Sequence, residues 1–356
     1  MIRLQPHPQD SMTPLERAQA IAEGRPYDRF PIVPFLGEIS ARLIGCSSIR
    51  EYTLTPRLIV EGEIAAFRRF GLDGLGAGPN SMGLAAALGA HIIYPEDSIP
   101  YIASPSVSDE AAAYALEPIC PKASPSMITA KEALERLLDV SYGITGVGSS
   151  LGGPFTICAF LLGTEQLLKS CIRNPELVHH MMRIVTDSIK NCVDELAPLG
   201  VGFGFADPVA SGSLISPNMY GKFVFPYMQE LCSYILGKTG SRPSLHMCGN
   251  TVKIWKYILQ LEICSLSIDN LVDLSLAKQE LGDRFAIVGN VPPVDVIMLG
   301  NRETIFASVK SCVDAAGDAP NGYTIAPGCN IPLKTKIQNI DWFMEAGRTY
   351  GRRRYD

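Results

Sequence analysis

Short apolar runs alternate along this chain with longer stretches in which apolar and polar residues recur at helical spacing. Each apolar run is brief and is bounded by Gly, Pro, Asn or Asp, as strands usually are. We expect eight strands, at residues 31–37, 73–78, 142–149, 200–207, 241–248, 263–270, 285–290 and 323–329. Regular alternation of strand and helix predicts a parallel sheet, and eight repeats in one chain favour a closed (β/α)8 barrel of the TIM type.

The stretches between the expected strands predict amphipathic helices. Residues 128–140 place apolar side chains on one face and charged side chains on the other. A helical hairpin is expected at 164–199, broken at Asn174-Pro175, where Asn caps the second helix and Pro fills its first turn. Gly282 and Gly317 fall where helices should end. Further helices are expected at 217–236 (after Ser216, a cap of the same kind), 251–261, 274–281, 302–315 and 333–350.

An open doubly wound sheet is the alternative architecture. It is disfavoured because no Gly-x-Gly-x-x-Gly motif follows the first expected strand, and Gly74, Gly76 and Gly78 in the second open no dinucleotide fingerprint. The chain shows no linker and no internal repeat, so we expect one barrel domain over residues 1–356, with a loop-rich insertion at 101–126.

Composition narrows the class of protein. Hydrophobic residues make up 47% of the 356 positions and charged residues 19%, which allows a large core and argues against disorder. The net charge is -5, and the one basic tract is the short run 352–354, so nucleic acid is a poor candidate partner. No apolar run approaches the roughly 20 residues that cross a membrane, and the first residues lack the apolar segment of a signal peptide. We therefore expect a cytoplasmic protein with no membrane partner.

Ten cysteines are spread along the chain, and most lie in apolar, helix-like stretches. In a reducing compartment such cysteines are small buried hydrophobic residues. This interpretation covers Cys158, Cys171, Cys192, Cys232 and Cys312. It does not cover the two cysteines that fall at the ends of expected strands, Cys248 and Cys329.

His246-Met247-Cys248 ends the fifth expected strand. Residues i and i+2 of a strand face the same side, so an imidazole and a thiol lie together, about 6–7 Å apart at the backbone. Such a pair also arises by chance, and His246 is equally explained as a buried histidine with satisfied hydrogen bonds. Cys329, at the end of the eighth strand, favours the metal interpretation, because strand ends converge at the mouth of a barrel.

One His and two Cys ligands favour zinc over harder ions, and three protein ligands leave a fourth position open, as in catalytic zinc sites. A thiol entering that position is held as thiolate at neutral pH, and a thiolate can attack an electrophilic methyl group. The resting fourth ligand is water or a nearby carboxylate.

Three further polar residues end expected strands and are candidate catalytic residues: Asp207, Asp269 and Asn290. They would orient the metal histidine, complete the metal shell or contact substrate. The alternative for each is helix capping or a loop hydrogen bond. His179 and His180 are adjacent on a helix and do not face one site, so we assign them to packing or to the surface.

Several short motifs are similar to those of one known family over nearly the whole chain. They lie at residues 12–17, 24–31, 153–156, 206–208, 216–217, 289–291 and 327–332. Together they resemble the uroporphyrinogen decarboxylase superfamily. The resemblance implies a (β/α)8 barrel, here with an N-terminal helical extension over residues 1–30.

The decarboxylase branch of that superfamily binds the carboxylates of a tetrapyrrole with arginines of an early Arg-Gln-Ala-Gly-Arg motif. The equivalent stretch here, residues 34–40, has no arginine. The decarboxylases also carry a histidine near the closing strand, where this chain has Cys329. Both departures count against tetrapyrrole decarboxylation, which stays as the alternative function.

The other branch contains the methylcobamide:coenzyme M methyltransferases, which carry a His-x-Cys…Cys zinc motif matched here by His246, Cys248 and Cys329. The resemblance implies transfer of a methyl group from a corrinoid on a partner protein, docked over the barrel mouth, to a zinc-bound thiol such as coenzyme M. Homocysteine and a tetrahydrofolate acceptor stay open. So does a non-catalytic zinc-binding barrel with a closed shell of four ligands.

Overall fold

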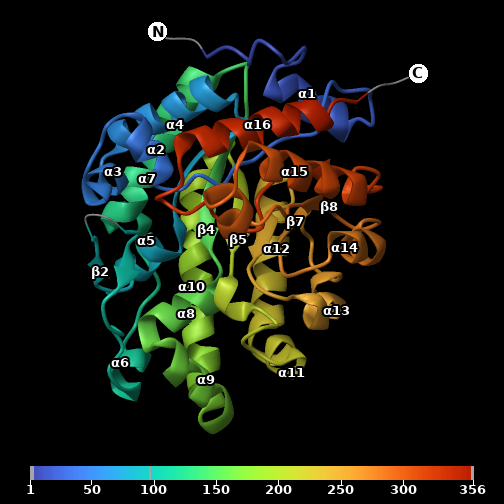
Figure 1. Cartoon of the computed structure of the whole chain (residues 1–356). Coiled ribbons are helices and arrows are strands. Elements are labelled where there is room, and N and C mark those ends of the chain that lie inside the picture. Colours follow the sequence, from blue (N-terminus) through green and yellow to red (C-terminus); the bar gives the residue numbers. More distant parts are fainter. Residues whose placement is uncertain (1–3, 96–97, 354–356) are drawn as a thin grey trace. The chain divides into compact units, whose positions relative to one another are not determined.

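The computed structural model describes residues 4–95 and 98–353 (Figure 1). The chain divides into two compact units, each assembled from separate stretches. Unit 1 contains residues 1–76, 136–147 and 265–356, and unit 2 contains residues 77–135 and 148–264. That the whole chain is a single domain stays a prediction.

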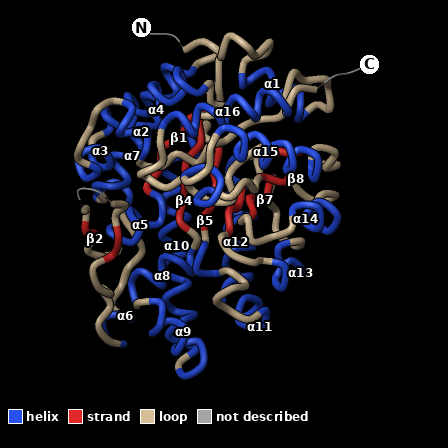
Figure 2. Tube along the Cα trace, viewed as in Figure 1, coloured by secondary structure: helices blue, strands red, loops and turns tan. Residues whose placement is uncertain are grey.

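A parallel sheet of seven strands runs through the chain, drawn in red in Figure 2. Within unit 2, β4, β5 and β6 pair in parallel, with Ala206 opposite His246. Within unit 1, β7, β8 and β9 pair in parallel. The strands are β1 (Leu75–Pro79), β4 (Val147–Gly152), β5 (Gly202–Ala206), β6 (Ser244–Met247), β7 (Ser265–Ile268), β8 (Ala286–Val288) and β9 (Tyr323–Thr324).

The first expected strand, 31–37, is reduced to a single parallel bridge between Ile32 and Ile325. The Val33 amide donates to the Ile325 carbonyl at 2.9 Å, but the extended backbone then ends. Phe35 and Gly37 take positive φ angles of 46° and 52°, which a strand does not allow. The structure thus has seven of the eight expected strands.

The insertion expected at 101–126 contains short elements in unit 2. There β3 (Tyr101–Ile102) pairs antiparallel with β2 (Ile92–Ile93), followed by α6 (Glu110–Tyr114) and a 3-10 turn. The other helices confined to unit 2 are α5 (Asn80–Ala87), α8 (Pro154–Leu162), α9 (Thr164–Arg173), α10 (Pro175–Leu196), α11 (Pro217–Met219), α12 (Phe225–Thr239) and α13 (Trp255–Ile258). Helix α7 (Pro125–Ser141) belongs partly to each unit.

The expected break between α9 and α10 is confirmed. Asn174 Oδ1 accepts the Leu177 amide at 3.2 Å, and Pro175 is the first residue of α10. The helix expected at 217–236 is instead interrupted by a π-helical stretch, Tyr220–Val224. Pro226 explains the interruption, because proline cannot donate to the carbonyl one turn back and its ring crowds that carbonyl.

In unit 1, α14 (Leu274–Leu281) and α15 (Arg302–Ala316) lie where they were predicted. Gly282 and Gly317 end them as expected, but with φ near -62° rather than in the left-handed region. Close backbone contact explains the glycines, because an added Cβ would lie 2.4 Å and 2.7 Å from helix carbonyl oxygens. The remaining helices of unit 1 are α1 (Pro14–Ala22), α2 (Ile39–Leu43), α3 (Ile49–Leu54), α4 (Pro56–Phe70) and α16 (Ile337–Tyr350).

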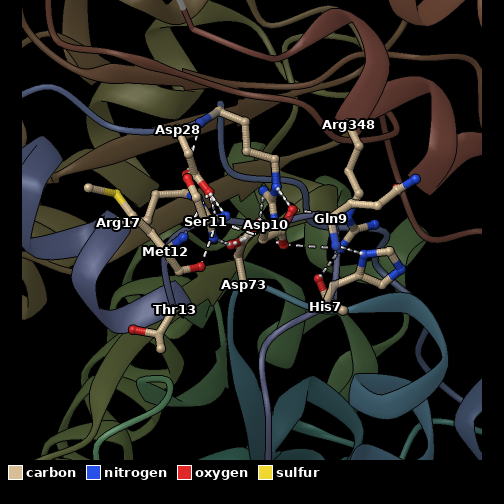
Figure 3. Close-up of polar contacts among 12 residues, drawn as sticks. His7, Gln9, Asp10, Ser11, Met12, Thr13, Arg17, Asp28, Asp73 and Arg348 are labelled. Atoms are coloured by element: carbon tan, nitrogen blue, oxygen red, sulfur yellow. Dashed lines mark hydrogen bonds and ion pairs between the residues drawn. The ribbon is translucent and has the colours of Figure 1, made fainter.

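Within unit 1, a buried cluster of charges joins the N-terminal segment and α16 to the residue just before β1 (Figure 3). Its three arginines and three aspartates are Arg17, Arg29, Arg348, Asp10, Asp28 and Asp73. Asp73, just before β1, accepts from both Arg17 and Arg29 and from the Ile32 amide at 2.7 Å. The cluster lies at the start of a barrel strand, where buried groups serve stability rather than catalysis.

No single helix among the described residues is long and apolar enough to span a membrane. Helices α8 and α9 pass that test only as a pair, and they are bent by 104° at Gly163.

Candidate metal centre

His246 and Cys248 lie side by side where β6 ends. The imidazole Nε2 is 3.2 Å from the Cys248 sulfur, and both residues are half-buried. Met247, between them, is 1% exposed and points to the other side of the strand. The alternation predicted from the sequence is confirmed.

Gly249 turns the chain directly after Cys248. Its φ is 73°, and an added Cβ would lie 2.6 Å from Ser211 Oγ and 2.7 Å from Ser213 Oγ. Ser213 Oγ also accepts the Asn250 amide at 2.8 Å. The loop after β5 therefore packs directly against the turn that carries the Cys248 thiol.

Asp207 follows β5 and is completely buried. Its backbone amide donates to the His246 carbonyl at 3.1 Å, which joins the ends of β5 and β6. Its Oδ1 accepts from the Thr156 amide at 2.8 Å and the Thr156 hydroxyl at 2.6 Å, whereas Oδ2 has no partner among the described residues. Burial raises the pKa of Asp207 to about 6, opposed by hydrogen bonds from Thr156 and Phe155. The Asp207 side chain is thus held by Thr156, and its backbone is held by the carbonyl of His246. A catalytic role for Asp207 stays a prediction.

Cys329 lies in unit 1, beyond the end of β9 rather than within the expected strand 323–329. Beyond the strand the chain stays beside the segment after β8 through a bridge between Pro327 and Val291. The Gly328 amide donates to the Val291 carbonyl at 2.9 Å, and the Ile331 amide donates to the Phe35 carbonyl at 3.1 Å. The half-buried Cys329 is thus held from both sides.

Asp269 and Asn290 lie in unit 1, and both belong to one loop network. Asp269 follows β7, and its Oδ1 accepts the Leu271 amide at 2.9 Å. The buried Asn290 side-chain amide donates to the carbonyls of Asp269 at 3.0 Å and Val272 at 2.7 Å. A Cβ on Gly328 would lie 2.4 Å from the Asn270 amide, so this loop also packs on the segment before Cys329. A catalytic role for either residue stays a prediction.

His179 and His180 pack within unit 2, in agreement with the sequence interpretation. His179 Nδ1 lies 2.9 Å from the Tyr227 hydroxyl, and burial lowers the pKa of His179. The His180 ring lies 4.7 Å from the Tyr114 ring. Neither histidine takes part in the candidate metal centre.

Sequence reasoning missed the partners that fix Asp207. Thr156 supplies both hydrogen bonds, and a Cβ on Gly153 would lie 2.2 Å from the Asp207 side chain. From the sequence, the motif at 153–156 indicates only the family resemblance. The signal in the sequence is Gly153, directly after β4. A glycine there allows the residue that follows β5, Asp207, to approach closely.

The chain matches the uroporphyrinogen decarboxylase (URO-D) family over residues 13–350. It belongs to that family. Its curated relatives include proteins named as methyltransferases and proteins named as uroporphyrinogen decarboxylases. The methylated-thiol–coenzyme M methyltransferase of Methanosarcina mazei is 27% identical over 65% of this chain, and the match spans 60% of that relative. The methylcobamide:CoM methyltransferase MtaA of Methanosarcina barkeri is 24% identical over 94% of this chain and 97% of its own length.

A solved structure supports the URO-D fold. A methyltransferase from Methanosarcina mazei is 21% identical, covers 96% of this chain and 99% of its own, and superposes with a TM-score of 0.79. The α/β barrel class predicted from the sequence is therefore confirmed.

His246 Nε2 and Cys248 Sγ, at the end of β6, are spaced to bind one zinc ion. Zinc–sulfur bonds of about 2.3 Å and zinc–nitrogen bonds of about 2.0–2.1 Å place the two donor atoms about 3.6 Å apart in a tetrahedral shell. The separation of His246 Nε2 and Cys248 Sγ is 3.2 Å, so a slight opening of the pair admits the ion.

Proposed function

We propose that this URO-D family member is a methyltransferase that moves a methyl group from a methylated corrinoid protein to a thiol acceptor. The observation that carries the proposal is the pair of zinc donors, His246 and Cys248, side by side at the end of β6. The relatives named as methylcobamide:CoM methyltransferases support the corrinoid donor and favour coenzyme M as the acceptor.

Cys329 is the proposed third zinc ligand. In a barrel the carboxyl ends of the strands converge at one mouth, and Cys329 follows the last strand as His246 and Cys248 follow β6. Three ligands of this kind leave a position for a substrate, as catalytic zinc sites do.

Zinc in this site would lower the pKa of an acceptor thiol, so that the thiol reacts as thiolate. In the overall reaction a sulfur–carbon bond forms and the cobalt–carbon bond breaks, its electron pair staying on cobalt while the thiol proton leaves. The chain supplies orientation. The Asp207 amide donates to the backbone carbonyl of His246. Gly249 and Gly328 allow the close backbone contacts beside the thiols of Cys248 and Cys329.

The contacts of Arg42 disfavour tetrapyrrole decarboxylation. Arg42 is the arginine that follows the arginine-free stretch 34–40. Its guanidinium donates to the backbone carbonyls of Leu333 and Thr335, the latter at 2.8 Å. Arg42 is therefore engaged by the loop after Cys329 and does not replace the missing carboxylate-binding arginines.

The direct test mixes zinc-loaded protein with methylcobalamin and one of several thiols, including coenzyme M and homocysteine. We expect zinc-dependent loss of the methyl–cobalt absorption band and formation of the matching methyl thioether. The same assay is repeated with a methylated corrinoid protein as donor. No demethylation with either donor and any thiol, or equal rates without zinc, would contradict the proposal.

A further inference from the structure

Unit 1 contains a cavity of about 300 Å³ that the proposed methyl transfer does not use. Its walls are residues 32–37, residues 72–76 and Glu63 of α4. The lining is mostly apolar, with Leu36, Leu72 and Leu75 among its side chains. This volume lies at the lower end of the range for small-molecule sites, roughly 300–1,000 Å³.

The cavity exists because residues 34–37 leave the extended conformation. The Gly76 amide of β1 donates instead to Glu63 Oε2 at 3.1 Å, and the Ser40 hydroxyl lies 3.4 Å from Glu63 Oε1. The Glu63 carboxyl, on helix α4, thus accepts the β1 amide that a carbonyl of a neighbouring strand would otherwise accept.

Glu63 has no ion-pair partner among the described residues, and it is partly exposed to the cavity. Asp73, the other carboxylate in the lining, is fully engaged by Arg17, Arg29 and the Ile32 amide. Burial raises the pKa of Glu63 to about 7, opposed by the hydrogen bonds from Gly76 and Ser40. The cavity therefore holds one carboxyl group that lacks a cation, within apolar walls.

We propose that this cavity binds a small organic ammonium ion, with its charge at the Glu63 carboxylate and its apolar part against Leu36, Leu72 and Leu75. A cation there would offset the cost of holding the half-buried carboxylate away from bulk solvent, and charge-assisted hydrogen bonds are stronger than neutral ones. Apolar walls add affinity in proportion to the area they cover. The proposal depends on neither zinc nor a corrinoid.

The occupant would touch the segment next to the candidate metal centre. Phe35 lines the cavity, and its carbonyl accepts the amide of Ile331, two residues after Cys329. A Cβ on Gly37 would lie 3.7 Å from the Asn330 side chain. The cavity wall and the Cys329 loop are therefore in direct contact within unit 1.

The test uses three probes of one shape: n-butylammonium, n-butanol and butyrate, each titrated into the full-length protein at constant ionic strength. We expect n-butylammonium alone to raise the thermal unfolding midpoint saturably. Glu63→Gln should weaken this binding by about tenfold or more, since a charged hydrogen bond contributes roughly 1.5–3 kcal/mol. Glu61→Gln, two positions away and paired with Arg57 on the exposed side of α4, is the matched control and should bind as wild type.

Saturation-transfer NMR on the wild-type protein keeps the proposal testable should Glu63→Gln fail to fold. Enhancement of the butyl signals for the ammonium ion and not for the alcohol would support it. Equal response to n-butylammonium and n-butanol, no response to either, or unchanged binding in a folded Glu63→Gln variant would overturn it.

Discussion

His246 Nε2 lies 3.2 Å from Cys248 Sγ, with the buried Met247 between them on the opposite face of the strand. We expect Cys248→Ala to lose bound zinc and methyl transfer together while keeping its fold, because one of the three proposed zinc ligands is removed. Zinc analysis, the demethylation assay and circular dichroism check this. Cys120→Ser, an exposed cysteine outside the centre, is the control. Full zinc content in Cys248→Ala would show that the ligand assignment is wrong.

Gly328→Ala should weaken zinc binding without unfolding the chain. An added Cβ would lie 2.4 Å from the Asn270 amide, so the backbone before Cys329 must shift. Loss of outer support for a metal ligand typically costs about 10–100-fold in affinity. Competition with a chelating zinc indicator measures the change. Gly146→Ala, where an added Cβ has open space, should bind zinc as wild type, and equal affinities in both variants would contradict the prediction.

Thr156→Val should destabilise the protein by about 1–3 kcal/mol, because it removes the hydroxyl that donates to the buried Asp207 and accepts the Val209 amide. Urea unfolding measures this change. Thr156→Ser keeps the hydroxyl and should lose less. Equal losses in the two variants would show that the methyl group contributes as much as the hydroxyl, and a negligible loss in Thr156→Val would show that the hydrogen bonds do not stabilise the fold.

Glu63 should make stability depend on pH. Its pKa is raised from 4.5 to about 7, so the folded protein holds this proton more tightly than the unfolded chain does. The free energy of unfolding therefore falls as pH rises from about 4.5 to about 7, by on the order of 2–3 kcal/mol, and this contribution is flat above that range. Tyr52 and Asp73 are the other titratable groups nearby. Asp207, whose pKa is also raised, contributes the same slope to both proteins. Urea unfolding across this range should therefore show a steeper fall in wild type than in Glu63→Gln, and parallel curves would refute the prediction.

Asp73→Asn should cost about 3–5 kcal/mol of stability, since it leaves Arg17 and Arg29 buried beside a neutral side chain. Zinc binding per folded molecule should not change. The exposed pair of Arg57 and Glu61 provides the comparison, because Arg57→Ala removes an interaction that contributes about 0.5 kcal/mol or less. Similar unfolding midpoints for the two variants would contradict a structural role for the buried cluster.

The barrel class and most helices followed from the sequence because their signals are local. The break at Asn174-Pro175 and the pair His246 and Cys248 depend only on neighbouring residues and a fixed repeat. What failed depends on distant contacts. Residues 31–37 have strand-like composition, but the turn at Phe35 and Gly37 ends the strand after one bridge.

For the candidate site, too, the sequence predicted local features and not contacts between distant residues. Asp207, Asp269 and Asn290 are predicted as candidates from their places after strands, but the contacts of their side chains are not predicted. Thr156 lies 51 positions before Asp207, and Val272 lies 18 positions before Asn290. No periodicity in the sequence encodes such pairings. The ion pairs of Arg17, Arg29 and Arg348 went unnoticed for the same reason.

The buried cysteines give this chain a built-in contrast in thiol reactivity. Burial raises the pKa of Cys192 and Cys232 to about 12 and of Cys171 to about 11, and raises that of Cys158 and Cys312 as well. Alkylating reagents react with thiolates, so these five positions should be slow to react at neutral pH, whereas the exposed Cys120 and Cys264 should react at once. Against that fixed background, the extent of labelling at Cys248 and Cys329 with and without added zinc, read by mass spectrometry from a single digest, tests whether these two thiols hold the metal.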